Sequence, residues 1–238
     1  MLNRSVLMVW PYCWSNWGNM MKVISSSMAL ALGLSLIAGN SMAAPEGGAS
    51  GGGWSPFQFS IYNPIQLVGE SKDITGLRFP LLYGKNVDVS GIDLALGATN
   101  SNNLTGIQMT GFVNWAASVK GIQIGGVGNE VTSLAGVQIS VFVNDVQSDA
   151  TGIQIAPINT VKGEMKGIQI GVLNSILAPK SSSVTGVQIG LFNFAGNVTG
   201  LQIGLANFCV DMNGVQIGVF NYIEQGRFKY LPLVNAKF

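Results

Sequence analysis

The sequence predicts an all-β protein built from repeated glycine-rich strands. The first observation is a phrase of glycine, aliphatic, polar and apolar residues that recurs ten times. Its openings are GLRF at 76, GIDL at 91, GIQM at 106, GIQI at 121, GVQI at 136, GIQI at 152, GIQI at 167, GVQI at 186, GLQI at 200 and GVQI at 214. The second observation is the spacing, which is 14 to 16 residues apart from one step of 19. A period this short holds one strand with its turn, or one coil of a solenoid.

The third observation is a strict alternation of side chains within each unit, with the opening glycine counted as position zero. Positions one and three are apolar in all ten units, which predicts a strand with one apolar face. Position two is glutamine in eight units: Gln108, Gln123, Gln138, Gln154, Gln169, Gln188, Gln202 and Gln216. Glycine within a strand indicates that another backbone or a large ring lies close.

An asparagine follows at position seven or eight of eight units: Asn114, Asn129, Asn144, Asn159, Asn174, Asn193, Asn207 and Asn221. Asparagine tolerates left-handed backbone and bonds local main chain, so we expect these residues to form turns. The alternative interpretation is a ladder of ligands.

The first architecture that fits is a twelve-strand antiparallel outer-membrane β-barrel. Each unit supplies about ten strand residues, which is the length that crosses a bilayer. Segments 57–67 and 228–238 add one strand at each end, and the total is even, as in bacterial barrels. Phe238 ends the last strand and resembles the C-terminal signal of outer-membrane barrels. In this architecture the apolar face meets lipid, and the outer membrane and its barrel-assembly machinery are the partners.

The alternative architecture is a β-solenoid with one repeat per coil. The nearly constant period favours it, because stacked coils cannot vary in length as surface loops do. Here we expect the Ile/Val face to point inward, the glutamines to form a ladder on the outer surface and the asparagines to stack at turns. In either architecture Arg78 and Asp93 replace glutamine in adjacent units, and we predict that they form an ion pair.

The N-terminal segments predict export. Residues 1–20 match no signal region, and a second Met at 21 indicates a mis-assigned start. Residues 21–43 have the basic, apolar and small-x-small regions of a signal peptide. Residues 44–54 form a Gly-rich linker, and 55–238 form a single β-repeat domain.

The composition indicates a protein without catalytic chemistry. The chain has no histidine, which excludes Ser-His-Asp and Cys-His systems and most zinc sites. Cys209 occupies a position that is apolar in other units, so we interpret it as a core residue. Glu130, Asp145 and Asp149 are interpreted as solvated turn residues. We therefore expect no catalytic, cofactor-binding or metal-binding residue.

The segment after the predicted signal peptide has few charged residues, which bears on the partners that we expect. Residues 44–238 hold ten Lys or Arg and eleven Asp or Glu. No polybasic stripe is present, so nucleic acid is not an expected partner. The oligomeric state is left open.

The pattern GxQIGxxN from 106 to 221, together with GLRFPLLYGKNVDVSGIDLALG and YLPLVNAKF, resembles a group of largely uncharacterised bacterial exported surface-repeat proteins. The resemblance covers most of the chain after residue 43. It implies a location in the cell envelope or at the cell surface, and it implies no activity, cofactor or catalytic residue. Together with the predicted export signal, we expect the protein in the outer membrane or at the cell surface of a Gram-negative bacterium.

Two functions follow from the two architectures. The barrel predicts a structural or narrow-pore outer-membrane protein whose glutamines line or plug the lumen. The solenoid predicts an extracellular surface or adhesion protein.

Overall fold

The computed structural model describes residues 53–176 and 182–238, which belong to a compact unit spanning 44–238. The expected start segment, the signal peptide and the linker up to residue 52 lie outside the described residues. Trp54, the last residue of the expected linker, already begins the first strand.

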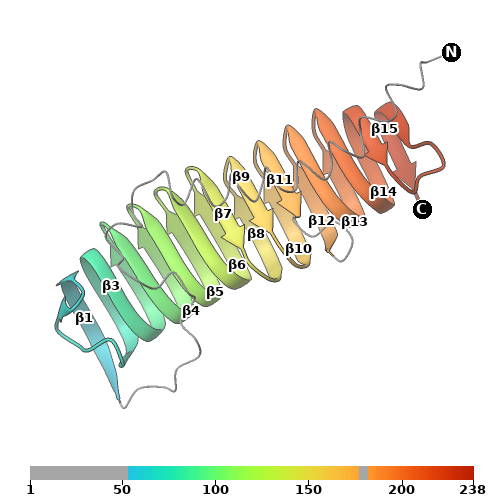
Figure 1. Cartoon of the computed structure of the whole chain (residues 1–238). Coiled ribbons are helices and arrows are strands. Elements are labelled where there is room, and N and C mark those ends of the chain that lie inside the picture. The colour runs from blue at the N-terminus through green and yellow to red at the C-terminus, as the bar shows by residue number, and fades with distance from the viewer. Residues whose placement is uncertain (1–52, 177–181) are drawn as a thin grey trace. The chain divides into compact units, whose positions relative to one another are not determined.

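The described residues form a β-solenoid in which the repeat units stack in chain order (Figure 1). The first strands are β1 (Trp54–Tyr62), β2 (Ile65–Gln66), β3 (Asp73–Ala95), β4 (Ala98–Thr110), β5 (Val113–Gly125) and β6 (Gly128–Ser140). The central coils contain β7 (Val143–Val146), β8 (Ala150–Ile155), β9 (Ile158–Val161), β10 (Met165–Ile170), β11 (Leu173–Ile176) and β12 (Ser183–Ile189). The last strands are β13 (Phe192–Ile203), β14 (Ala206–Ile223) and β15 (Tyr230–Lys237).

Successive units pair in parallel and in register. Gly121 lies opposite Gly136 and Gln123 opposite Gln138, and the same match of equal positions continues through the later coils. The predicted antiparallel twelve-strand barrel is therefore wrong, and the alternative solenoid describes the fold. The barrel interpretation counted one strand per unit, whereas each unit contributes two strand segments joined by a bend.

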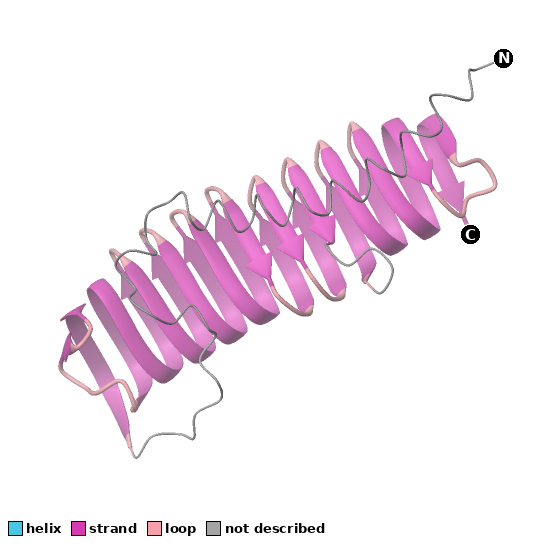
Figure 2. Ribbon diagram, viewed as in Figure 1, coloured by secondary structure: helices cyan, strands magenta, loops and turns pink. Residues whose placement is uncertain are grey.

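The two segments build two layers, which the central coils separate most clearly (Figure 2). The Gln sheet consists of β8, β10, β12, the glutamine-containing segments of β4–β6, β13 and β14, and the segments of β3 that carry Arg78 and Asp93 in place of glutamine. The Asn sheet consists of β7, β9, β11 and the asparagine-containing segments of the strands that run through both layers. In the long strands the chain passes from one layer to the other within a single strand.

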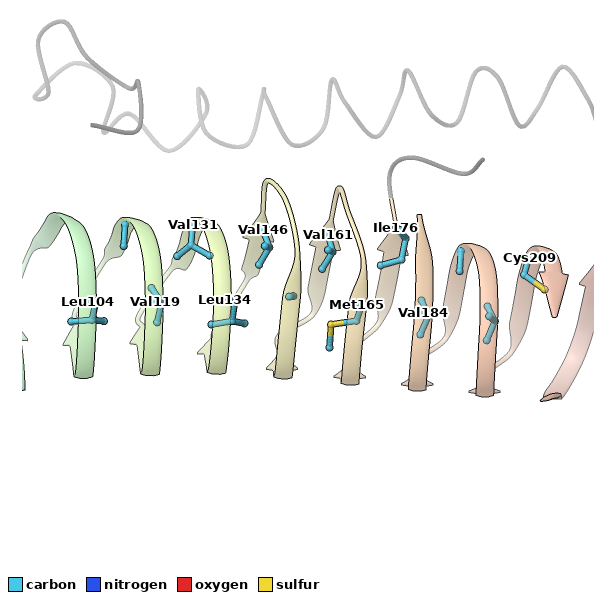
Figure 3. Close-up of a cluster of buried hydrophobic side chains, with 14 of the residues drawn as sticks. Leu104, Val119, Val131, Leu134, Val146, Val161, Met165, Ile176, Val184 and Cys209 are labelled. Carbon is cyan, nitrogen blue, oxygen red and sulfur yellow. The ribbon is translucent and has the colours of Figure 1, made fainter. Parts of the chain in front are cut away.

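The apolar core lies between the two sheets as two columns of side chains (Figure 3). One column comes from the residue two places before each glycine: Ile74, Val89, Leu104, Val119, Leu134, Ala150, Met165, Val184, Val198 and Met212. The other comes from the residue two places after each asparagine: Ala116, Val131, Val146, Val161, Ile176, Ala195, Cys209 and Ile223. Each coil thus adds about two apolar side chains to a continuous core.

Antiparallel strands cover both ends of the stack. At the N-terminal end β2 pairs with part of β1. At the C-terminal end β15 pairs with β14, and its Pro232 and Lys237 are residues that discourage further strand addition at an edge. Parallel stacking therefore gives way to antiparallel pairing at both ends of the described stack.

The glycine at position zero is required by two constraints at once. In all ten units its φ lies between +132° and +154°, a conformation that side chains other than glycine rarely adopt. A Cβ at Gly121 would also lie 2.0 Å from the carbonyl oxygen of Gly106 in the preceding coil. The close approach that the sequence indicated is therefore the backbone of the neighbouring coil.

We predict that Gly121→Ala lowers the free energy of unfolding by about 3 kcal/mol, because the backbone strain adds to the contact with the preceding coil. Chemical denaturation followed by circular dichroism measures this change. Gly69→Ala is the matched control, since a Cβ there meets nothing within 4 Å. Equal stability of the two variants would contradict the close-packed glycine column.

Candidate functional site: two buried amide ladders

The eight repeat glutamines point into the solenoid and form one continuous hydrogen-bonded ladder. All eight side chains are fully buried. The Nε2 of each glutamine donates to the Oε1 of the glutamine in the preceding coil, over distances of 2.7 to 3.0 Å. Parallel strands in register place equal positions about 4.8 Å apart, which suits this bond. The ladder therefore gives every buried Nε2 a hydrogen-bond partner, and it gives one to every Oε1 except that of Gln216.

An ion pair begins the ladder. Gln108 donates to Asp93 Oδ2 over 2.7 Å, and Arg78 donates to the two carboxylate oxygens of Asp93 over 2.9 and 2.5 Å. Both charged side chains are fully buried. The structure thus brings together the two residues that the sequence paired. Because every glutamine directs its donor group toward Asp93, the aligned amide dipoles stabilise the buried carboxylate.

The N-terminal end of this column is closed by backbone. Gln58 occupies the equivalent place in β1, opposite Arg78. Its amide donates to Val68 O over 3.1 Å, and its Oε1 accepts from Val68 N over 2.8 Å. At the other end, Gln216 Oε1 has no hydrogen-bond partner among the described residues, and Asn235 of β15 lies opposite Gln216. The amide of Gln58 at the N-terminal end of the column is therefore paired through both its nitrogen and its oxygen, whereas the oxygen of Gln216 at the C-terminal end is not paired.

The eight repeat asparagines form a second ladder with the opposite polarity. From Asn114 to Asn221, each Nδ2 donates to the Oδ1 of the asparagine in the following coil over 2.6 to 3.0 Å. In the seven asparagines before Asn221 the same Nδ2 also donates to the position-three carbonyl of the following coil, as Asn129 does to Ile139 O over 2.9 Å. These residues therefore stack as a ladder. They lie within strands and not in the turns that the sequence predicted, and their second hydrogen bond holds the chain near the end of the Gln-sheet strand in the following coil.

The inward glutamines correct the orientation expected for a solenoid. That expectation placed the aliphatic side chains at positions one and three inside and the glutamines outside. In the structure the glutamines are buried, while Ile107, Ile122 and Ile170 are 37 to 38% exposed. The ladder removes the usual penalty for burying amides, and the flanking core columns supply the apolar interior. The glutamines bond to one another inside the solenoid, whereas the barrel interpretation had placed them around a lumen.

Two further expectations concern single residues. Phe238 lies past the end of β15, is 90% exposed and closes no barrel. Cys209 is buried in the apolar core, as expected, and burial raises the pKa of its thiol to about 12. It is therefore protonated and unreactive at neutral pH.

Glu130 and Asp145 are not the solvated turn residues that the sequence suggested. They lie opposite each other on β6 and β7, on the outer side of the Asn sheet. Burial raises the pKa of both carboxyls, and the neighbouring Asp145 raises that of Glu130 further. Trp115 Nε1 donates to Glu130 over 3.2 Å, and Thr160 donates to Asp145. Within residues 53–176 and 182–238 no group of three or more His, Cys, Asp or Glu residues could hold a metal ion.

The comparisons with protein-family models, curated proteins and solved structures give no match. Among the described residues there is no helix long and apolar enough to cross a membrane.

We predict that Gln154→Glu makes the stability of the protein strongly pH-dependent. A buried carboxyl has a raised pKa in the folded state, so the folded protein holds its proton more tightly than the unfolded chain. The stability of the Gln154→Glu variant relative to wild type is then highest below about pH 4.3, the pKa of glutamate in the unfolded chain. It falls as the pH rises toward the raised pKa of this carboxyl in the folded protein. Denaturation curves from pH 4 to pH 8 measure the difference from wild type.

Gln225→Glu is the control for this series, because Gln225 is exposed in the loop between β14 and β15. Its stability relative to wild type should change little with pH. A flat profile for Gln154→Glu would show that position 154 is hydrated rather than buried in a ladder.

We predict that Asp93→Gln costs about 3 to 5 kcal/mol of stability, because it leaves the buried Arg78 guanidinium without its counter-ion. The double variant R78Q/D93Q should recover most of this loss, since it continues the glutamine ladder. A double-mutant cycle measures the coupling. Additive effects of the two single substitutions would contradict the paired role of these residues.

Proposed function

We propose that the protein is a non-enzymatic β-solenoid exported to the surface of a Gram-negative bacterium, where it serves as a structural or adhesive surface element. The observation that carries the proposal is the repetition of the solenoid itself. Each coil presents the same kinds of side chain at the same surface positions, about 4.8 Å from the coil before. Such an array suits repeated contacts whose weak affinities combine through avidity.

The buried chemistry supports a structural role. The amides of both ladders bond to each other and to the main chain, so they hold the coils in register. Cys209 is protonated and buried, and the sequence has no histidine. The polar groups that an enzyme would direct at a substrate are here directed at the neighbouring coil.

The export signal predicted from residues 21–43 and the resemblance to exported surface-repeat proteins support the proposed location. The low charge content is compatible with it: only 10% of the residues are charged, against about 25% in average soluble domains.

Labelling of intact cells with a membrane-impermeant amine reagent tests the location. We predict that Lys166, whose side chain is 60% exposed, is modified on intact cells to the same extent as on lysed cells. Mass spectrometry of the peptide that contains Lys166 measures the modification, and a cytoplasmic protein serves as the control for lysis. Modification of Lys166 only after lysis would contradict surface exposure.

A further inference from the structure

The outer side of the Gln sheet is an unbroken aliphatic face. It consists of positions one and three of all ten units, which carry Ile, Val, Leu, Met or Phe and no charged residue. Nine of these side chains are 37 to 45% exposed, namely Leu77, Ile92, Ile107, Met109, Ile122, Ile155, Ile170, Ile189 and Ile217. Sequence reasoning had directed these side chains either to lipid or to the core.

The aliphatic face continues around the adjoining turn. Positions five and six of several units add exposed apolar side chains, which are 39 to 61% exposed. They are Leu96, Phe112, Val141, Phe142, Val172, Leu191, Phe192, Leu205, Val219 and Phe220. On the other border runs an exposed column, position minus one, that is rich in threonine and contains only two charged residues, Lys120 and Lys166. An apolar surface bordered by polar residues marks an interaction site.

We infer that this aliphatic face binds the same face of a second copy of the chain, so that two solenoids pack sheet against sheet. This inference goes beyond the proposed function, because it holds wherever the protein is located.

Period and charge both favour a second copy as the occupant. Side chains of two copies have the same spacing of about 4.8 Å along the stack, so the rows of one face can interdigitate with the rows of the other. Because positions one and three carry no charged residue, packing two copies face to face brings no like charges together at these positions. Contact through equal surfaces is also the geometry of a closed two-fold dimer.

The size of the aliphatic face also meets the requirement for a stable dimer. Nine steps between coils and the six residues of a Gln-sheet strand such as β10 give roughly 700 Å² per partner, from the usual strand spacing and rise. A standard protein interface buries about 800 Å² per partner. The acidic pair Glu130 and Asp145 lies on the Asn sheet and would remain outside this interface.

Sedimentation velocity of the purified full chain tests the inference. We expect the wild-type protein to sediment as a dimer at micromolar concentration and the variant I122E/I170E to sediment as a monomer. These two side chains lie on the aliphatic face and are 37 and 38% exposed. The substitutions place carboxylates within the contact, and they leave the ladder glutamines Gln123 and Gln169 unchanged.

The control variant A117E/T132E adds the same charge at a column outside the aliphatic face. Ala117 and Thr132 are half-buried neighbours at the bend between the two sheets, where the later coils carry Gln147 and exposed Lys162. This variant should remain a dimer with the circular dichroism of the wild type. The variant I122T/I170T is the second test if I122E/I170E loses its β-sheet signal. It keeps β-branched side chains, and we expect it to weaken dimerisation at least tenfold.

Two results would overturn the inference. The first is a wild-type monomer at all concentrations tested, including a monomer that co-sediments with phosphatidylcholine vesicles, since this would assign the aliphatic face to lipid. The second is a dimer that A117E/T132E and I122E/I170E affect equally. Neither result bears on labelling at the cell surface, so the inference and the proposed function fail separately.

Discussion

The structure depends on one interaction, the hydrogen bond between the side-chain amides of equal positions in successive coils. A single bond of this kind contributes only about 1 kcal/mol, but an amide left unpaired in the interior would cost more than that. Parallel pairing in exact register satisfies all the rungs together, and a slip of one residue would face each glutamine with a side chain of another kind. The two ladders thus select the register that the glycine column and the core columns also require.

The two ladders also explain how a chain with few charges can hold a buried ion pair. Glutamine donors point toward the N-terminal end of the stack, whereas asparagine donors point toward the C-terminal end. The side-chain amide dipoles of the two ladders therefore point in opposite directions along the stack. The Asp93 carboxylate lies where glutamine donors converge, and Arg78 supplies the compensating charge within the same column.

The repeat itself was sufficient to predict an all-β fold, the solenoid alternative and the pairing of Arg78 with Asp93. Strand direction was not predictable, because the alternation around position two is nearly the same in both chain directions. The inward orientation of Gln123 in a solenoid was missed because burial of an amide depends on a partner in another coil, which periodicity does not reveal. The replacement of glutamine by Arg78 and Asp93 in adjacent units could have revealed this orientation. If these two residues form an ion pair, the glutamines at the same position of other units also contact one another between coils.

Hydrogen exchange of side-chain amides, followed by ¹⁵N NMR, shows whether the glutamine ladder is buried and bonded. We expect the Nε2 protons bonded between rungs, such as those of Gln138 and Gln169, to exchange many times more slowly than those of exposed Gln225. Exchange of the ladder glutamines at the rate of Gln225 would contradict a buried amide ladder.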